Sequence, residues 1–275
     1  MKEMTIREVQ MVCLEILKDV HDFCLKNDIK YSLCGGTLIG AIRHNGFIPW
    51  DDDVDIVMPR PEYDRFIHTY QSQKGYKLFS HEIKGGKNVR IRLTKVCDMQ
   101  KTIMDKGAYV WTNEDTGIGI DIIPADGAPM TLDEAQKHIA SLAKYAGIVD
   151  RYRTKYASFS CINRYKTPIA KLKFVIRKVR GYFIDRNCVM KFIDIQKQYD
   201  YQSSSFFCAG YVYGVGEWLP KCILEEFELH KFENTVFFIT KQYDNYLKRV
   251  FGNYMVLPPE NKRTSHDIYR YYWKD

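Results

Sequence analysis

Apolar and polar residues alternate along this chain with periods that predict both helices and strands. From Ile6 to Cys24 the apolar positions recur every three or four residues, which predicts an amphipathic helix, and Thr5 with Glu8 matches a capping box at its start. The same reasoning predicts helices at 37–42, 60–70, 131–146, 168–180 and 240–250, strands at 31–34, 53–58, 76–79, 89–96 and 119–124, and a β-hairpin at 223–239. Interleaved strands and helices predict a mixed α/β fold.

The acidic run at 51–55 gives the first indication of chemistry. In a strand, Asp53 and Asp55 would share one face while Val54 and Ile56 point into the core. Acidic clusters usually lie in solvated loops, but the apolar alternation that follows indicates a strand that becomes buried. Carboxylates crowded there repel one another unless a cation lies between them. We therefore expect a site for Mg²⁺ or Mn²⁺, which prefer oxygen ligands.

A glycine pair lies just upstream of these acids. Gly35 and Gly36 separate a predicted strand from a predicted helix that begins at Thr37. Backbone N–H groups at a helix start lack intrahelical partners and face the positive end of the helix dipole, so they can bind phosphate oxygens. A glycine pair alone usually marks only a turn. With the acidic strand after it, the pair predicts a phosphate site formed by Gly35, Gly36 and Thr37.

Three segments of the chain resemble a known family. They are GGTLIGAIRHNGFIPWDDDVDIVMPRPEYDRF from Gly35, GIDIIPADG from Gly119 and FGNYMVLPPENKRTSH from Phe251. The first is similar to the signature of LicD-type phosphotransferases, a branch of the nucleotidyltransferase superfamily that includes the fukutin-related proteins. The resemblance covers most of the chain and is weakest between about residues 150 and 205.

The resemblance implies a fold and an activity. The fold would be α/β (α+β), with a nucleotidyltransferase-like mixed sheet flanked by helices. The activity would be transfer of a phospho-alcohol, often phosphocholine, from a CDP-linked donor to a sugar hydroxyl. The acceptor would be a surface glycan, such as lipopolysaccharide or teichoic acid, or its lipid-linked precursor.

The family also implies a third carboxylate. Asp121 is the acid within the apolar segment 119–124, and a lone buried acid requires a partner. In the resembling superfamily a neighbouring strand supplies this acid, so the metal ligands would be Asp53, Asp55 and Asp121. Asp121 would act as that third ligand or as the general base for the acceptor hydroxyl, and both roles stay open. Asp126 precedes a glycine and is expected to lie in a turn.

Positive side chains are candidates for contact with the donor phosphates. Arg90 and Arg92 share one face of the predicted strand 89–96, where they either form a solvated surface or neutralise the donor. The resemblance places the C-terminal tail near the donor. Lys262, Arg263 and His266 of this tail are therefore candidates, and Arg43, shortly after the glycine pair, is a further one.

Composition and charge narrow the class of partner. The chain has 275 residues, a formal net charge of +7 and eight scattered cysteines. The positive charge favours anionic partners, whereas no nucleic-acid-binding motif is recognised. The cysteine spacing favours reduced thiols over disulfides or zinc ligands. Without a recognisable signal peptide or spanning segment, we expect a cytoplasmic protein.

The middle of the chain differs in composition from the rest. Residues 152–186 are rich in Lys, Arg and aromatic residues, and 168–180 reads as a basic amphipathic helix. This helix either lies on the inner face of an anionic membrane or packs on the catalytic core with a solvated basic face. We therefore divide the chain into a catalytic core at 1–150, a helical basic insertion for acceptor or membrane contact at 151–205, and a C-terminal hairpin, helix and tail at 206–275 that completes the site.

Two other functions remain open. A related enzyme would move a nucleotidyl group and release pyrophosphate, whereas phospho-alcohol transfer from a CDP-linked donor releases CMP. A non-catalytic protein that binds nucleotides or glycans could share the same scaffold.

Overall fold

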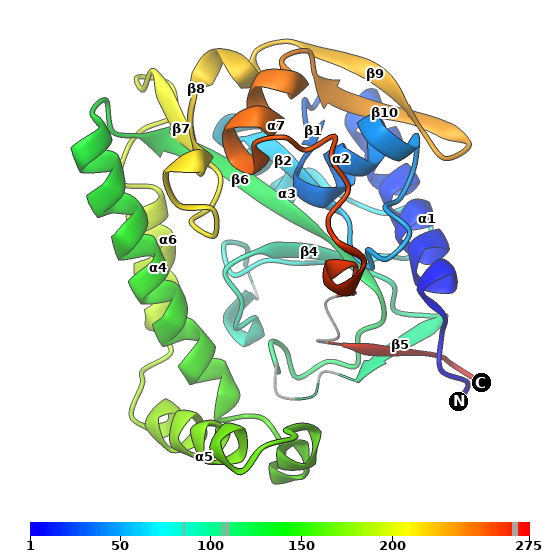
Figure 1. The fold of residues 1–275 in the computed structure, drawn as a ribbon, viewed down its shortest axis with the longest axis vertical. Coiled ribbons are helices and arrows are strands. Elements are labelled where there is room, and N and C mark those ends of the chain that lie inside the picture. Colours follow the sequence, from blue (N-terminus) through cyan, green and yellow to red (C-terminus); the bar gives the residue numbers. More distant parts are fainter. Residues whose placement is uncertain (85, 106, 108–109, 266–268) are drawn as a thin grey trace.

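The computed structural model describes the whole chain except residues 85, 106, 108–109 and 266–268 (Figure 1). Its α-helices are α1 (Ile6–Lys26), α2 (Gly35–His44), α3 (Arg60–Thr69), α4 (Leu132–Thr154), α5 (Pro168–Tyr182), α6 (Cys188–Gln196) and α7 (Tyr243–Phe251). Its strands are β1 (Ser32–Leu33), β2 (Asp55–Pro59), β3 (Lys77–Phe79), β4 (Thr94–Cys97), β5 (Thr102–Asp105), β6 (Gly119–Ala128), β7 (Phe206–Cys208), β8 (Trp218–Pro220), β9 (Phe227–Phe232), β10 (Thr235–Thr240) and β11 (Arg270–Trp273). Short 3-10 helices are η1 (Gly86–Asn88), η2 (Phe159–Arg164), η3 (Gly214–Glu217), η4 (Lys221–Leu224) and η5 (Glu260–Lys262).

The long strand β6 organises the main sheet. Among the described residues this mixed sheet has seven strands, in the order β1-β2-β6-β4-β3, with β7 added to β6 and β8 added to β7. The first half of β6 pairs in parallel with β2 and antiparallel with β4, and its last residues pair with β7. One strand thus holds the two parts of the sheet together. The mixed α/β fold predicted from the sequence is confirmed.

The main core lies between this sheet and the N-terminal helices. The capping box forms as predicted, since Glu8 N–H donates to Thr5 Oγ1 over 3.3 Å and Thr5 N–H donates to the Glu8 carboxylate over 2.8 Å. Helix α1 then buries the apolar face that its periodicity predicted, including Leu14, Ile16 and Leu17. Helices α1 and α3 both contact β6, while α2 contacts β2.

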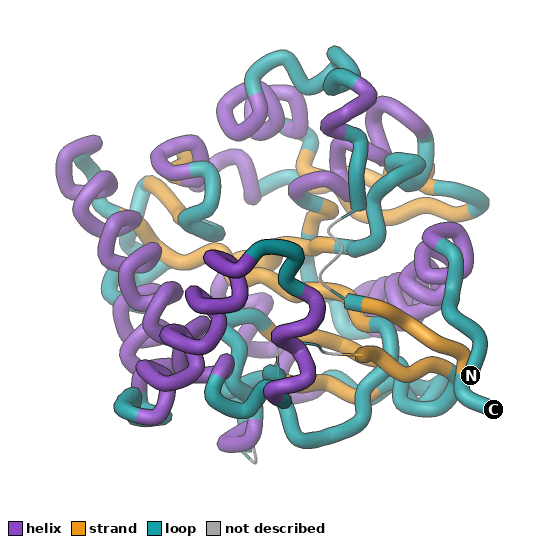
Figure 2. The backbone as a smooth tube through the Cα atoms, turned by 60° about the horizontal axis from the view of Figure 1, so that its bottom comes forward, coloured by secondary structure: helices purple, strands orange, loops and turns teal. Residues whose placement is uncertain are grey.

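A second core lies beside the first. Apolar residues of α4 and α6 pack together with Cys208 of β7 and Trp218 of β8. Helix α4 runs along one side of the molecule to α5, which lies at the bottom of the view in Figure 1 and comes forward in Figure 2. Every helix in the described part of the chain is too short or too polar to cross a lipid bilayer.

Several predicted boundaries are wrong. Helix α2 begins at Gly35, so the glycine pair is its first turn and not a separate linker. Strand β2 begins at Asp55, so Asp53 precedes the strand. The predicted strand 89–96 begins only at Thr94. Val89 and Ile91 pack in a cluster with Trp111, so the alternation there reflects loop packing and not strand pairing.

The predicted turn at Asp126 is also wrong. Asp126 and Gly127 continue β6, where they pair with Cys208 and Phe207 of β7. The strand continues because a partner about eighty residues later in the chain satisfies its backbone groups, which no local pattern indicates.

Candidate active site

Two neighbouring parallel strands bring the predicted acids together. Asp55 is the first residue of β2 and is the register partner of Asp121 in β6. The Asp121 N–H donates to the Val54 carbonyl over 2.8 Å, which fixes the start of β2 against β6. Alternation buries Ile56 and Ile122, so the two acids share the opposite face. The expectation that β2 and a neighbouring strand each supply an acid therefore agrees with the geometry.

The glycine segment lies against these acids. Gly35 has a φ of +57°, and a Cβ added there would lie 3.3 Å from Asp55 Oδ2. A Cβ on Gly36 would lie 2.6 Å from Asp51 Oδ2. Thr37 Oγ1 accepts a hydrogen bond from the Asp55 N–H over 2.9 Å. The first turn of α2 and the acidic segment thus form one site, and side chains larger than hydrogen would separate them.

A cavity opens beside the acids. It has a volume of about 180 Å³ and is lined by charged residues of both signs and two tyrosines, among them Asp52, Asp53, Arg92, Lys95, Asp121, Arg153, Tyr269 and Tyr271. The Lys95 ammonium contacts Asp121 Oδ1 directly. A cavity with acids on one side and cations beside them suits a ligand that carries phosphate groups and is bound together with a metal ion.

The electrostatics of the site favour an added cation. Burial raises the pKa of Asp55 well above its ordinary value, and the negative charges of Asp53 and Asp121 raise it further. Burial opposes the charge of Lys95, but nearby groups, with the Asp121 carboxylate first among them, together raise the pKa of Lys95, so that it stays charged. One ammonium therefore faces several carboxylates.

The donor atoms near Asp55 fit a hard divalent cation. Among the described residues, no three His, Cys, Asp or Glu side chains are gathered so that they alone could hold a metal ion. Magnesium commonly takes only one or two carboxylates and completes its shell with substrate phosphates and water. Asp53 and Asp55 could supply these two carboxylates, whereas Asp121 already contacts Lys95. The assignment of metal ligands stays a prediction.

The arginines at 90 and 92 have different surroundings. Arg92 lines the cavity, with Nη2 3.1 Å from Asp150 Oδ1. Arg90 is buried away from it, with its guanidinium 3.7 Å from the centre of the Tyr156 ring and a 2.7 Å hydrogen bond to Asn113. Of these two candidates, Arg92 is positioned for ligand contact, and neither arginine forms a solvated surface.

Where the structure describes them, the other positively charged side chains predicted to bind phosphate lie outside the cavity lining. Arg43 Nη1 donates to the Tyr254 carbonyl over 2.6 Å, and the Arg263 guanidinium lies 5.4 Å from the centre of the Trp50 ring. Burial lowers the pKa of Arg43, and the charge of nearby Arg263 lowers it further. Neither is among the described residues that line the cavity, and Lys262 is exposed in η5. The predicted residue His266 lies outside the described residues.

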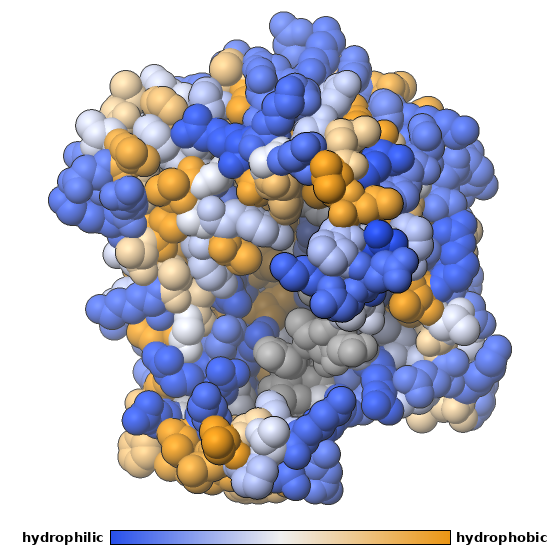
Figure 3. All heavy atoms as spheres, in the orientation of Figure 1, coloured by the Kyte–Doolittle hydropathy of each residue, from blue (hydrophilic) through white to orange (hydrophobic). Residues whose placement is uncertain are grey.

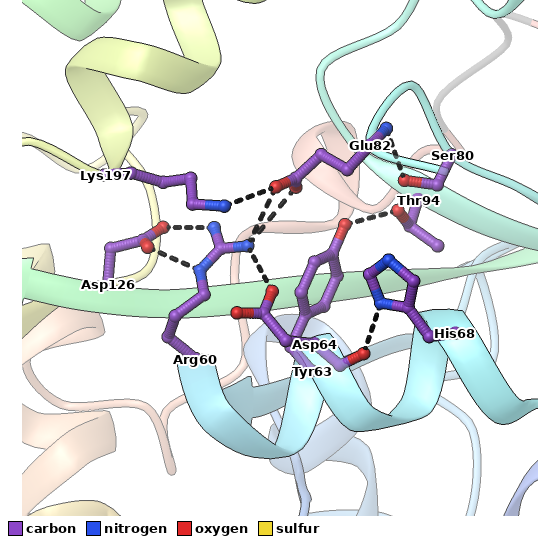
Figure 4. Close-up of polar contacts among 9 residues, drawn as sticks. All are labelled: Arg60, Tyr63, Asp64, His68, Ser80, Glu82, Thr94, Asp126 and Lys197. Atoms are coloured by element: carbon purple, nitrogen blue, oxygen red, sulfur yellow. Dashed lines mark hydrogen bonds and ion pairs between the residues drawn. The ribbon is translucent and has the colours of Figure 1, made fainter. Parts of the chain in front are cut away.

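A buried ion cluster fixes the far ends of the two site strands (Figure 4). Arg60, the first residue of α3 directly after β2, donates to Asp126 of β6 through Nε at 2.6 Å and Nη2 at 2.7 Å. Arg60 also contacts Glu82, which pairs with Lys197 over 3.2 Å. Burial raises the pKa of Asp126 to about 6, so the two short bonds join ionised groups at neutral pH.

Sequence reasoning missed several of these residues. Lys95 and Arg153 face the cavity, yet nothing in their local patterns marks them among the 41 Lys and Arg residues. Glu217 in η3 is a further case, because burial raises its pKa to about 7. Burial raises the pKa of Tyr246, and the charge of Glu217 adds to this shift. The Tyr246 hydroxyl accepts a hydrogen bond from the Gly35 N–H over 3.4 Å. The sequence around Glu217 is punctuated by glycines at 210, 214 and 216, a pattern that predicts a loop and does not single out the acid.

Comparison with known proteins agrees with the motif resemblance. Residues 28–138 match the family described as LicD/FKTN/FKRP, nucleotidyltransferase domain. The chain is 32% identical over 282 residues to the lipopolysaccharide cholinephosphotransferase LicD of Haemophilus influenzae, with 99% of each chain covered. Shorter matches are to uncharacterised proteins of Rickettsia typhi, 43% identical over 26% of this chain and 23% of that one, and Rickettsia prowazekii, 33% identical over 36% of each.

Proposed function

Because the chain belongs to the LicD family of transferases, we propose that it moves phosphocholine from CDP-choline to a sugar hydroxyl of lipopolysaccharide or its lipid-linked precursor. The substrate class comes from the Haemophilus relative, which is similar over nearly the whole of both chains. The observation that supports the chemistry is the cavity in which Asp53 and Asp121 lie beside Lys95 and Arg92. The free cysteines, seven of them buried, suit the cytoplasm, where we expect the enzyme to act.

The first step is binding of the donor diphosphate. The Gly36 and Thr37 N–H groups lie in the first turn of α2, where backbone donors lack intrahelical acceptors. Arg92 on the cavity wall adds positive charge, and Tyr246 orients the Gly35 N–H. Asp53 and Asp55 would hold Mg²⁺ or Mn²⁺, which when bound offsets negative charge on the phosphates.

The second step needs a base for the acceptor hydroxyl. Asp121 lies beside the cavity and contacts Lys95. We propose that its carboxylate takes the proton from the sugar hydroxyl, while Lys95 holds the carboxylate in place. The sugar oxygen attacks the phosphorus that carries choline, the bond to the bridging oxygen breaks, and CMP leaves. The product is a phosphodiester between the sugar and choline.

The donor and acceptor are tested together. Purified protein and magnesium are incubated with CDP-choline, CDP-ethanolamine, CDP-glycerol or CDP-ribitol, with and without lipopolysaccharide, and products are identified by mass spectrometry. The proposal requires CMP release from CDP-choline that needs both metal and acceptor. Release from another donor would change the alcohol. Pyrophosphate release from a nucleoside triphosphate would replace the proposed reaction by nucleotidyl transfer.

A further inference from the structure

Helix α5 carries a stripe of large apolar side chains on its outer surface. The stripe positions are spaced by three and four residues, as one face of a helix requires. The exposed fractions are 68% for Ile169, 60% for Leu172, 42% for Ile176, 49% for Val179 and 87% for Phe183. Figure 3 shows apolar atoms gathered over α5 at the bottom of the view. A face of this kind is unusual on an isolated soluble surface.

The orientation of α5 is fixed by contacts on its other side. Phe174 is buried in a small core with Ala157 and Cys161. The Lys178 ammonium donates to the Lys155 carbonyl over 2.6 Å and also to the Ala157 carbonyl. A Cβ added at Gly181 would lie 2.4 Å from the Arg151 carbonyl oxygen, so the helix approaches α4 closely there. The apolar stripe therefore cannot turn inward without breaking these contacts.

The charged residues within the helix are all positive. Pro168–Tyr182 contains five basic residues and no acidic residue. Four of the five are exposed, namely Lys171, Lys173, Arg177 and Arg180. On the helix Lys173 and Arg180 lie next to the stripe, where long side chains can extend to a charged boundary while their methylene groups stay near apolar atoms.

We propose that α5 docks on an anionic lipid surface, with the stripe inserted at the level of the headgroups and the basic residues facing lipid phosphates. Apolar insertion combined with Lys and Arg at the boundary is the arrangement by which interfacial helices bind such surfaces. A second copy of the chain fits less well, because stacking two α5 faces would bring like charges together. The nearby aromatic residues Phe159 and Tyr182 are also exposed, and aromatic side chains suit the membrane interface.

The cavity and the docking helix are connected through α4. Arg153 belongs to α4 near its junction with α5 and also lines the cavity. If the acceptor is attached to a lipid, its sugar would then be presented to the cavity from the same surface. This consequence rests on the proposed function, whereas lipid docking itself does not.

Vesicle flotation tests the docking without any donor or acceptor. The full chain is mixed with vesicles of phosphatidylcholine alone or with phosphatidylglycerol added, at low salt and at about 0.5 M salt, where charges are strongly screened. We expect flotation only with phosphatidylglycerol and weaker flotation at high salt. The double variant Leu172→Asn/Ile176→Asn should bind about tenfold or more weakly, since both apolar side chains leave the interface.

A matched control comes from the β9–β10 hairpin, which lies at the other end of the molecule from α5 in Figure 1. Leu229 and Val236 are 52% and 42% exposed, so Leu229→Asn/Val236→Asn removes similar apolar surface and should leave flotation unchanged. Circular dichroism confirms that each variant is folded. The proposal is overturned if the wild type does not float with anionic vesicles, if it floats equally with neutral ones, or if the α5 variant floats as well as the wild type. Light scattering that shows a dimer in the wild type and a monomer in the α5 variant would assign the face to a second copy instead.

Discussion

The replacement Asp126→Ala removes the main partner of a buried arginine and should strongly destabilise the fold. Arg60 has a side chain only 8% exposed, and Asp126 only 2% exposed. Two hydrogen bonds of 2.6 and 2.7 Å join them. The pair also links the start of α3, directly after β2, to β6, five residues beyond the register partners Asp55 and Asp121. Its loss would therefore weaken the alignment of the two strands that carry the acids.

The magnitude follows from what remains after the change. Breaking a buried ion pair by removing one partner costs about 3 to 5 kcal/mol, because the other charge stays buried. Glu82 remains 3.2 Å from Arg60 Nη1 and Asp64 remains 3.3 Å from it, so part of the charge is still offset. We therefore expect a loss of about 3 kcal/mol in the free energy of unfolding, at the lower end of this range.

Urea unfolding followed by circular dichroism measures this loss, with the slope checked to show that the unfolded state is unchanged. The control is Asp133→Ala, which breaks an ion pair of 2.6 Å between side chains that are 75% and 73% exposed. Such pairs contribute little, so the control should change stability by less than about 0.5 kcal/mol. A loss under about 1 kcal/mol for Asp126→Ala would refute the reasoning.

Three further predictions concern the site and its support. Lys95→Met should lower the rate of CMP release at least about tenfold, because the contact with Asp121 is lost. The circular dichroism spectrum should stay unchanged. An unchanged rate would remove Lys95 from the mechanism. Gly40→Ala places a Cβ 2.4 Å from the Gly46 carbonyl oxygen and should cost about 1 to 3 kcal/mol, measured as a lower Tm. Glu217 has a pKa of about 7 in the folded protein, against an ordinary value of 4.5. Between these two pH values the folded protein therefore keeps a proton on Glu217 that the unfolded chain has released. Wild-type stability should therefore fall as pH rises from the ordinary pKa of Glu to about 7, and Glu217→Gln should be more stable than the wild type by about 3 kcal/mol at pH 8. Parallel stability curves for both proteins would contradict the shift.

Local patterns predicted those features whose causes lie close together in the sequence. The capping box and apolar stripe of α1 are set within single helical turns, and the β9–β10 hairpin joins neighbouring segments. Asp53 and Asp55 could be proposed as site residues because the apolar residues after Asp53 indicate where a strand enters the core. The resemblance then indicated Asp121, which the structure places beside Asp55.

The features that sequence reasoning missed depend on partners far along the chain. Asp126 continues a strand because β7 pairs with it and Arg60 binds its carboxylate, 66 residues away in the sequence. Arg90 is withdrawn from the site because Tyr156 of the helical region offers an aromatic face. The exposed face of α5 is likewise set by Lys178 and Gly181 packing inward, which a helical period alone does not determine.

The most direct test of the proposed reaction is transfer by variants of the acidic segment. Wild type, Asp53→Asn and Asp55→Asn are incubated with CDP-choline, magnesium and lipopolysaccharide, and the acceptor is examined by mass spectrometry for added phosphocholine. The account predicts metal-dependent addition by the wild type, and none by either variant although both fold and retain the stability of the wild type. Transfer retained by either variant would contradict the assignment of these carboxylates as the centre of the reaction.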